Sequence, residues 1–428
     1  MAIAGGDRGD AVSPGGNKDA ALSGLRVIEM GQLIAGPFCG QLLADFGAEV
    51  IKIEAPGVGD PMREWGREKP HGQSLWWPVI ARGKKSVEID ARTPDGQSII
   101  RDLAARADVV VENFRPGTMQ RWGLGYDDLA AINPGLIMIR VSGYGQTGPY
   151  SGKAGFGAIG EAMGGLRYVV GDPSTPPSRT GISLGDTLAA TFACLGGLMA
   201  LHARGRTGRG QVVDSAIYEA VLAVMENLVT EYDKTGYIRE RTGAILPNIA
   251  PSNVYPTRSG TFVLIAANQD TVFRRLTAVM GRPELATDPR YATHTQRGQH
   301  QRELDALIAD WTQTMDREEL GRVLDEGGIP RGDIYRAPEM LEDVHFRARK
   351  AIVEIADPVL GKLKMQNAFP LLSDTPGAVT TSGPALGQHN ADILQGLLGY
   401  GDERIAALAA AGIIGKMGDA RPVSSLVE

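Results

Sequence analysis

Strand-like and helix-like segments alternate along the chain from residue 24 to residue 142. The strand-like runs are rich in β-branched residues, and helical spacing such as that of FCGQLLADFGA and PDGQSIIRDLAARA separates several of them. Strands that alternate with helices in this way form a mostly parallel sheet that helices cover on both faces. The sequence therefore predicts an α/β domain with a Rossmann-like sheet, built from GLRVIEM, EVIKIE, SVEID, DVVVENF and LIMIRVS.

The middle of the chain has a different pattern. The run VYPTRSGTFVLIAAN is typical of a β-hairpin, and helical segments follow it. Strands and helices that are grouped apart predict a smaller α+β domain over residues 235–335. Its expected helices lie around Val272 to Met280, Glu303 to Thr314 and Arg317 to Glu326.

The rest of the chain is expected to form one large domain, with residues 23–234 as its first part. This part ends with a long apolar helix, GDTLAATFACLGGLMALHARGRTG, a strand, GQVVDSAI, and a helix from Tyr218 to about Tyr232. A helix that is apolar nearly all round indicates a buried element or an oligomer contact. Strand-like residues and a helical pair from Asn390 to Ile414 predict that residues 336–415 return to the large domain.

Composition and charge exclude several classes of protein. The chain has 428 residues, 43% hydrophobic and 22% charged, which is typical of a soluble globular protein. Its net charge of -6 argues against broad nucleic-acid binding. We expect a cytoplasmic protein, because the longest apolar stretches are too short to span a bilayer and no signal peptide is evident.

Residues 1–22 lack an apolar period, which predicts a disordered leader, and residues 416–428 form a C-terminal tail.

Few residues suit a metal or a disulfide. The six histidines are scattered without paired spacing, so we expect no metal site. Cys39 and Cys194 lie in apolar helical patterns, where an inert core thiol is expected rather than a disulfide or a nucleophile.

A glycine-rich stretch follows the strand-like run Leu136 to Val141. Gly143, Gly145 and Gly148 spell G-x-G-x-x-G there. In a dinucleotide-binding turn the third glycine opens a helix, and an acidic residue ends the next strand about 20 residues later. Here residues 149–152, Pro-Tyr-Ser-Gly, keep the chain turning. The pattern therefore favours a glycine-rich surface loop over a pyrophosphate cradle.

Six segments occur in an order that is typical of one enzyme family: LSGLRVIEMGQLIAGPFCGQLLADFGAEVIKIEAPGVGD, VVVENFRPG, SGYGQTGPY, GISLGD, GRGQVVDSAIYEA and PALGQHNADIL. Together they resemble the family III CoA-transferases, which include formyl-CoA transferases, dicarboxylate CoA-transferases and 2-methylacyl-CoA racemases. The resemblance runs from Leu22 to Ile414. It implies coenzyme A thioesters and carboxylic acids as substrates, without a tightly bound cofactor, a metal, or a nucleic-acid or membrane partner. It also implies an open, ring-like chain path in an interlocked homodimer.

Asp186 matches the catalytic aspartate of that family. From the residues alone Asp186 is an N-cap, because it precedes a helical segment. The two interpretations are compatible, since a helix N-terminus stabilises a carboxylate and offers N–H donors to an oxyanion. The resemblance implies that Asp186 attacks the acyl-CoA to give a mixed anhydride and then an aspartyl-CoA thioester.

The resemblance also implies a set of positions around coenzyme A. Arginine binds phosphate through two parallel hydrogen bonds, and an apolar or aromatic wall suits adenine. Each cation is equally compatible with a solvated surface charge. The glycine-rich loop would be a lid or pocket wall, with a plain connecting loop as the alternative. The matching positions are Leu33, Ile34, Ala35, Ile89, Arg92, Asn113, Phe114, Arg115, Arg121 and Lys153.

Departures from the family pattern narrow the function. Ala55 stands where some formyl-CoA transferases have an arginine, and residues 248–269 lack their long glycine-rich insertion, which disfavours an oxalate or formyl substrate. Phe156 occupies the place of the racemase histidine and Asn268 roughly that of an acidic racemase residue, while Asp186 is retained. The sequence resembles the succinyl-CoA:dicarboxylate transferases best. Two alternatives remain: a 2-methylacyl-CoA racemase, and a non-catalytic nucleotide-binding protein in which Asp186 is only a cap.

Overall fold

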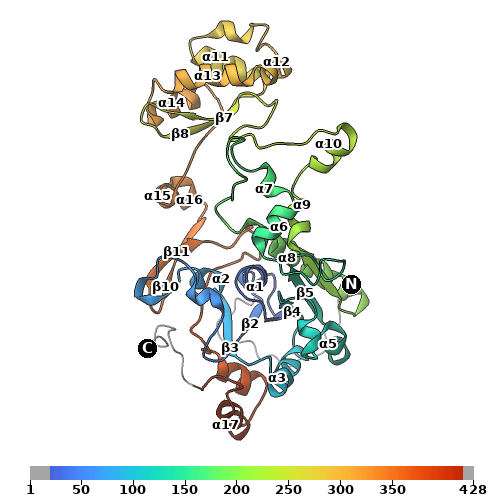
Figure 1. The fold of residues 1–428 in the computed structure, drawn as a ribbon. Helices are drawn as coiled ribbons and strands as arrows, with labels where there is room; N and C mark the ends of the chain where they lie inside the picture. Colours follow the sequence, from blue (N-terminus) through green and yellow to red (C-terminus); the bar gives the residue numbers. More distant parts are fainter. Residues whose placement is uncertain (1–19, 418–428) are drawn as a thin grey trace. The chain divides into compact units, whose positions relative to one another are not determined.

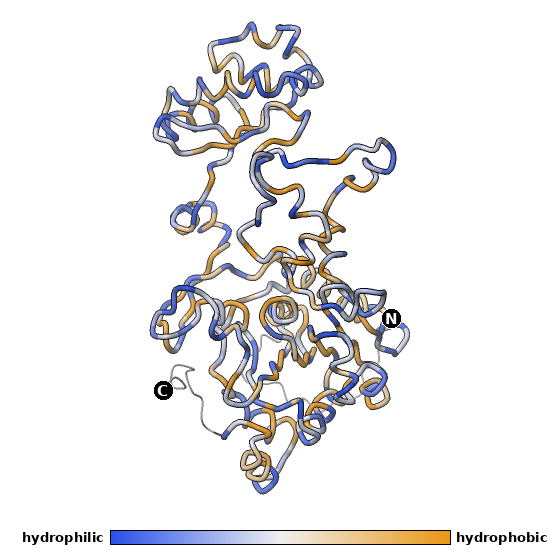
Figure 2. The backbone as a smooth tube through the Cα atoms, viewed as in Figure 1, coloured by the Kyte–Doolittle hydropathy of each residue, from blue (hydrophilic) through white to orange (hydrophobic). Residues whose placement is uncertain are grey.

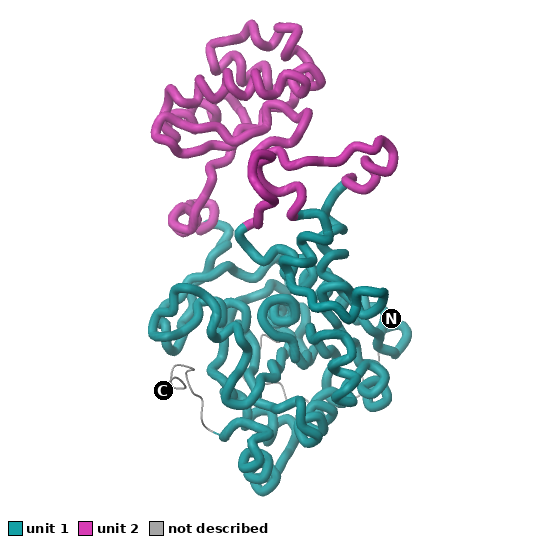
Figure 3. The backbone as a smooth tube through the Cα atoms, in the orientation of Figure 1, with its two compact units in different colours: residues 1–166, 181–226, 348–428 teal, residues 167–180, 227–347 magenta. Residues whose placement is uncertain are grey.

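The computed structural model describes residues 20–417. The C-terminal residues 418–428 and most of the predicted leader, residues 1–19, lie outside the described part. Leu22, the last residue of that leader, is already part of the fold, because its N–H donates to the Phe46 carbonyl (2.9 Å) and its side chain packs on a hydrophobic core. The described residues form two compact units (Figure 3): unit 1 comprises residues 20–166, 181–226 and 348–417, and unit 2 comprises residues 167–180 and 227–347.

Unit 1 contains the predicted sheet, which has six strands in the order β3-β2-β1-β4-β5-β6 (Figure 1). All five pairings are parallel, with Val27 beside Val50 on one side and beside Val109 on the other. The prediction of a mostly parallel sheet is therefore confirmed. The strands are β1 Arg26–Glu29, β2 Glu49–Glu54, β3 Lys84–Glu88, β4 Val109–Glu112, β5 Ile137–Ser142 and β6 Val212–Ala216.

Helices cover both faces of this sheet. Ile28 and Ile51 face a core that helices α3 and α5 share, whereas their neighbours Val27 and Val50 face a core that α1 and α8 share. The strands are therefore apolar on both faces, and hydrophobic residues run along them in the interior of unit 1 (Figure 2). The helices of this part are α1 Ala35–Asp45, α2 Trp77–Ile80, α3 Pro94–Ala104, α4 Thr118–Arg121, α5 Tyr126–Ile132, α6 Gly157–Met163, α8 Leu184–Thr207 and α9 Ile217–Leu222. Helix α7, Leu166–Val169, follows α6 along the chain, and all but its first residue belong to unit 2.

Helix α8 is long and apolar enough to cross a membrane by length and composition alone. In this structure α8 packs on one face of the sheet, where it contacts α1, β5 and β6. Gly196 and Gly197 permit a close approach: an added Cβ would lie 2.7 Å from Val213 Cγ1 and 2.6 Å from Ile139 Cδ1, respectively. The opposite side of α8 leaves several large apolar side chains exposed, namely Phe192, Leu195, Leu198 and Met199.

The C-terminal part of the chain lies in unit 1. Ile393 and Ile405 pack into the same core as α3, and Ile414 forms a β-bridge with Ile89 beyond the end of β3. The elements are the antiparallel hairpin β10 Ile352–Asp357 and β11 Gly361–Gln366, a π-helical segment Asp392–Leu397, and α17 Asp402–Ala410.

Unit 2 contains a three-stranded antiparallel sheet and several helices, some of which share a hydrophobic core with it. Val263 and Ile265 of β8 form a core with Phe273, Leu304 and Leu320 from three helices. The strands are β7 Ser252–Pro256, β8 Phe262–Ala266 and β9 Arg331–Asp333, and the helices are α10 Leu228–Thr235, α11 Asp270–Val279, α12 His294–Gln299, α13 Gln301–Thr312, α14 Arg317–Glu326, α15 Ala337–Glu342 and α16 Val344–Ala348.

Two local features differ from the sequence prediction. The single helix expected from Tyr218 to Tyr232 is two helices, α9 and α10, and Glu226 between them adopts a left-handed backbone conformation (φ 53°) that does not occur within a continuous α-helix. Residues 167–180 belong to unit 2, although they precede the predicted range 235–335. The Gly243 N–H donates to the Gly171 carbonyl (3.0 Å) and Arg241 Nη1 donates to the Tyr168 carbonyl (3.1 Å).

Candidate functional site

The strand order reverses direction at β1, which lies between β2 and β4. In a doubly wound sheet the turns after two such strands leave in opposite directions, and ligands bind in the crevice between them at the carboxyl ends. The turn after β1 and the segment after β4 meet at this point, because Gln32 N–H donates to Asn113 Oδ1 and Asn113 Nδ2 donates to the Gln32 carbonyl, both at 2.8 Å. The structure therefore brings the predicted positions 33–35 and 113–115 together.

The other predicted positions follow neighbouring strands at the same edge, and they differ in exposure. Arg92 after β3 is exposed and forms a two-pronged ion pair with Asp90, with both distances at 2.8 Å, which holds the pKa of Asp90 below its usual value. Ile89 is only 1% exposed, so its side chain is part of the core next to this edge and offers no surface to a ligand. Phosphate contacts at this strand end would therefore come from Arg92.

Two further predicted cations and an aromatic ring follow β4. Arg115 is exposed, and so is Arg121, whose Nη2 donates to Thr118 Oγ1 (2.9 Å). Phe114 packs edge-on against Trp122, with ring centroids 5.2 Å apart. This segment offers positive charge and an aromatic wall next to the crevice.

Asp186 lies in the first turn of α8 and is half-buried. The N-cap of this helix is Ser183, so the prediction that Asp186 itself is the N-cap is wrong by three residues. Because α8 connects two parallel neighbours, β5 and β6, it begins at the carboxyl edge of the sheet. A hydrogen bond from Ser215 Oγ near the end of β6 to the Ala189 carbonyl (2.9 Å) fixes this placement. Asp186 is therefore at the same edge of unit 1 as the crevice.

Helix α6 packs directly on the first turn of α8. A Cβ added to Gly157 would lie 2.2 Å from Asp186 Oδ2, so the carboxylate rests against the glycine backbone. One turn further along α6, Glu161 is 1% exposed, and its Oε1 accepts from the Gly185 N–H (3.0 Å). Sequence reasoning missed both residues. The spacing of Gly157 and Glu161, four apart on one helix face, was the available signal.

The glycine-rich loop also lies at this edge. Gly145 and Gly148 have positive φ (83° and 85°), and the next helix, α6, begins only at Gly157, so the geometry of a dinucleotide-binding turn is absent from this loop. The Gln146 N–H donates to Asp214 Oδ2 (2.9 Å), and burial raises the pKa of Asp214. The ammonium group of Lys153, a predicted ligand residue, lies over the Tyr150 ring, 3.6 Å from its centroid.

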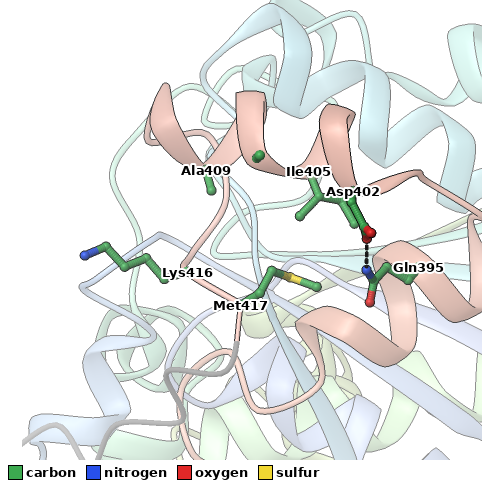
Figure 4. Close-up of a pocket in the computed structure, with 7 residues that line it drawn as sticks. Gln395, Asp402, Ile405, Ala409, Lys416 and Met417 are labelled. Atoms are coloured by element: carbon green, nitrogen blue, oxygen red, sulfur yellow. Dashed lines mark hydrogen bonds between the residues drawn. The ribbon is translucent and has the colours of Figure 1, made fainter.

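The other cavities and side-chain clusters have fewer features of an active site. A cavity of about 360 Å³ lies beside α17, where Gln395 Nε2 donates to Asp402 Oδ1 (2.8 Å; Figure 4), but no predicted site residue lines it. Within residues 20–417 no group of three or more His, Cys, Asp or Glu side chains is placed to hold a metal ion. Cys39 and Cys194 are buried free thiols.

Comparison with known proteins gives consistent results. The family model for CoA-transferase family III matches residues 22–390. The chain is 61% identical over 393 residues to a succinyl-CoA--D-citramalate CoA-transferase from Chloroflexus aurantiacus, covering 92% of this chain and 98% of that protein. It is 35% identical to a succinate--glutarate CoA-transferase from Agrobacterium fabrum, covering 88% and 96%. The crystal structure of a CAIB/BAIF family protein from Brucella suis matches with a TM-score of 0.79 at 34% identity, covering 89% and 100%.

Proposed function

The chain belongs to CoA-transferase family III, and from this premise we propose that it moves coenzyme A from succinyl-CoA to a small dicarboxylic acid, with Asp186 as the nucleophile. The observation that supports this most is the position of Asp186, in the first turn of α8 at the sheet edge that carries the switch-point crevice. A thioester bound along that edge would lie near the Asp186 carboxylate, and the helix N-terminus favours negative charge there.

The proposed substrates follow from what similar proteins have in common. The Chloroflexus aurantiacus relatives are named for succinyl-CoA with D-citramalate and with L-malate, at 61% and 41% identity, and the Agrobacterium fabrum relative for succinate and glutarate. All of these acids carry two carboxylates, and citramalate and malate are 2-hydroxy acids. We therefore propose a 2-hydroxy dicarboxylic acid as the acceptor and succinyl-CoA as the donor.

In the proposed mechanism one Asp186 oxygen attacks the thioester carbonyl carbon of the donor. The C–S bond breaks, a mixed anhydride forms, and coenzyme A leaves as its thiolate. The thiolate then attacks the aspartyl carbonyl carbon, the anhydride C–O bond breaks, and succinate leaves while an aspartyl-CoA thioester remains. The acceptor carboxylate then attacks the aspartyl-CoA thioester, which forms a second mixed anhydride and releases the CoA thiolate. The thiolate attacks the acceptor's acyl carbon in this anhydride, which gives the acceptor's CoA thioester and restores the Asp186 carboxylate. One thioester replaces another, so the exchange needs no ATP.

The surroundings of Asp186 suit these steps. Contact with Gly157 on one side limits where the carboxylate can point, and Glu161 holds the adjacent Gly185 N–H. Both the anhydride and the enzyme thioester hydrolyse readily, so the site must exclude water during exchange. The loop of residues 143–155 follows β5 at the same edge, and we propose that it forms part of the wall.

Incubation with succinyl-CoA and a panel of acids tests this function directly. Mass spectrometry of the CoA esters should show new thioesters with citramalate or malate and much less with acetate, which lacks the second carboxylate. If succinyl-CoA is neither exchanged with any acid nor hydrolysed, the protein is a non-catalytic binder. If it exchanges equally well with acetate, the proposed recognition of two carboxylates is wrong.

The racemase alternative makes a different prediction. Racemisation needs acid–base groups on both faces of the carbon next to the thioester. Phe156, at the place of the racemase histidine, cannot transfer a proton, and it is a surface residue with 67% exposure. We expect a 2-methylacyl-CoA in deuterated water to take up no deuterium at that carbon above background. Rapid uptake without acyl exchange would establish the racemase reaction instead.

We also propose that the protein is a homodimer. The exposed side of α8 presents Phe192, Leu195, Leu198 and Met199. Contiguous apolar side chains of this kind mark association surfaces in soluble proteins. Light scattering should give twice the chain mass, and substitution of Met199 and Leu195 by glutamate should shift the protein toward monomer. A fully active wild-type monomer would contradict the proposal.

A further inference from the structure

Side chains from other segments hold the backbone of the turn after β1 at three consecutive residues. The ammonium group of Lys52 donates to the Gly31 carbonyl. The Asn113 side chain binds both the N–H and the carbonyl of Gln32, and Asp60 Oδ1 accepts from the Leu33 N–H at 3.1 Å. Four backbone groups in a row are therefore fixed by side chains from three other segments.

The backbone conformation of Leu33 explains why these hydrogen bonds to the turn are needed. Its φ is 63°, in the left-handed region that residues other than glycine rarely adopt. A non-glycine residue in such a conformation is strained and persists where surrounding contacts determine it. The hydrogen bond from the Leu33 N–H to Asp60 fixes the peptide plane next to this residue and so helps to hold the turn in this conformation.

Asp60 and Lys52 belong to a buried ionic cluster below the turn. Lys52 Nζ lies 2.7 Å from Asp60 Oδ2 and 3.1 Å from Glu29 Oε1, and Lys84 Nζ lies 2.7 Å from Glu29 Oε2. All four side chains are at most 1% exposed. Burial by itself lowers the pKa of Lys52, but the carboxylates of Asp60 and Glu29 more than compensate and raise it, so Lys52 is charged.

At neighbouring strand ends, buried carboxylates also bind the backbone of turns. Each of β1 to β4 ends in a buried glutamate, and three of these carboxylates accept a backbone N–H from the turn that follows or from an adjacent turn. Glu54 accepts from Asp60 (2.9 Å), Glu88 from Gly57 (2.7 Å) and Glu112 from Phe114 (2.7 Å). Buried ion pairs are costly in stability unless well paired, so their concentration at this edge points to a use beyond stability.

We propose that Asp60 and Lys52 are positioning residues of the coenzyme A thioester site, which hold the Gly31–Leu33 turn in the conformation that receives the ligand before it arrives. The inference rests on the proposed function, because it takes this turn as part of the binding crevice. In the same arrangement Asn113 acts on the ligand through Gln32, since both ends of its amide are engaged by the Gln32 backbone. Preorganisation of this kind improves affinity by removing the cost of ordering the turn on binding.

Asp60→Asn is the informative substitution. Both ends of the carboxylate are engaged: Oδ1 accepts hydrogen bonds from the Leu33 and Met62 N–H groups, and Oδ2 forms an ion pair with Lys52. An amide has a donor at one end, so it must lose either the turn or the lysine. We expect the Kd for free CoA and the KM for succinyl-CoA to rise about tenfold or more, with kcat changed by less than about threefold.

Asp45→Asn is the matched control. Asp45 is also a buried carboxylate with both oxygens paired, to Arg82 Nε (2.8 Å) and Nη2 (2.6 Å), and it is the last residue of α1. It lies about 15 Å along the helix from Ala35, at the opposite edge of the sheet. A general loss of stability would affect both variants alike, whereas loss of positioning affects CoA binding in Asp60→Asn alone. Equal effects on Kd, or no effect in Asp60→Asn, would overturn the inference.

Hydrogen exchange of the wild-type protein gives a test that does not depend on a variant folding. Fragments containing the Leu33 amide should be protected in the ligand-free protein to nearly the same degree as β1. Exchange as fast as in the exposed loop 143–155, with protection gained only on adding CoA, would show that the ligand orders the turn and would overturn the inference. Failure of the proposed function is distinct, because wild-type protein would then neither bind CoA nor exchange acyl groups.

Discussion

Asp186→Ala is expected to reduce CoA transfer by about a thousandfold or more, because the substitution removes the group that forms both covalent intermediates. The loss should appear in kcat, measured as exchange of succinyl-CoA with the best acceptor acid. CoA binding should remain, since the predicted binding positions follow other strands of the sheet. Ser183 rather than Asp186 is the N-cap residue of α8, and we expect the substitution to remove about 1 kcal/mol of favourable charge at the helix N-terminus.

Asp402→Ala is a suitable control for that experiment. Asp402 also lies in the first turn of a helix, α17, but in a segment that contains no candidate site residue. Both variants should retain the circular dichroism spectrum of the wild type and similar melting temperatures, and the control should keep full activity. A folded Asp186→Ala protein with most of its activity would mean that the covalent mechanism is wrong.

Gly157→Ala is expected to lower kcat by about a hundredfold while the protein remains folded. The new methyl group would lie 2.2 Å from Asp186 Oδ2, so the carboxylate must rotate away. The obstacle is a side-chain end, which moves easily, and alanine suits the first turn of α6, so stability should change little. A displacement of about 1 Å of a reacting group is enough for a loss of this size.

The control for this substitution is Gly205→Ala. Gly205 is a helical glycine of α8, and an added Cβ there would have no neighbour within 4 Å. The control should keep wild-type kcat and KM. If Gly157→Ala had normal kcat, Asp186 would not need its observed orientation. If it raised KM alone, Gly157 would contact the bound substrate rather than position the nucleophile.

The sequence predicts the sheet well, because its strands are apolar on both faces and each is a short run bounded by turn residues. The same strands carry a signal that is easy to overlook: RVIE, EVIKIE, KKSVE and VVVE all end in glutamate. A charged residue that ends a buried strand must be paired, and its partners then hold the adjacent turns. Glu29, Glu54, Glu88 and Glu112 mark the edge where the candidate site lies.

Other features are not accessible from the sequence because they depend on contacts between distant segments. Periodicity does not show that Glu226 adopts positive φ, since glycine is the usual residue there. It does not assign residues 167–180 to unit 2, because the hydrogen bonds responsible join residues about 70 positions apart. The contact of Gly157 with Asp186 joins two helices and is equally invisible along the chain.

Trapping of the enzyme-bound thioester tests the central claim most directly. Hydroxylamine converts an aspartyl thioester or anhydride into a hydroxamate on the aspartate. Trypsin cleaves after Arg179 and Arg204, and the fragment of residues 180–204 contains Asp186 as its single acidic residue. Mass spectrometry should therefore find the hydroxamate on this fragment when succinyl-CoA is present and not when it is omitted. A hydroxamate on another fragment, or an unmodified protein under conditions where acyl exchange proceeds, would contradict the account.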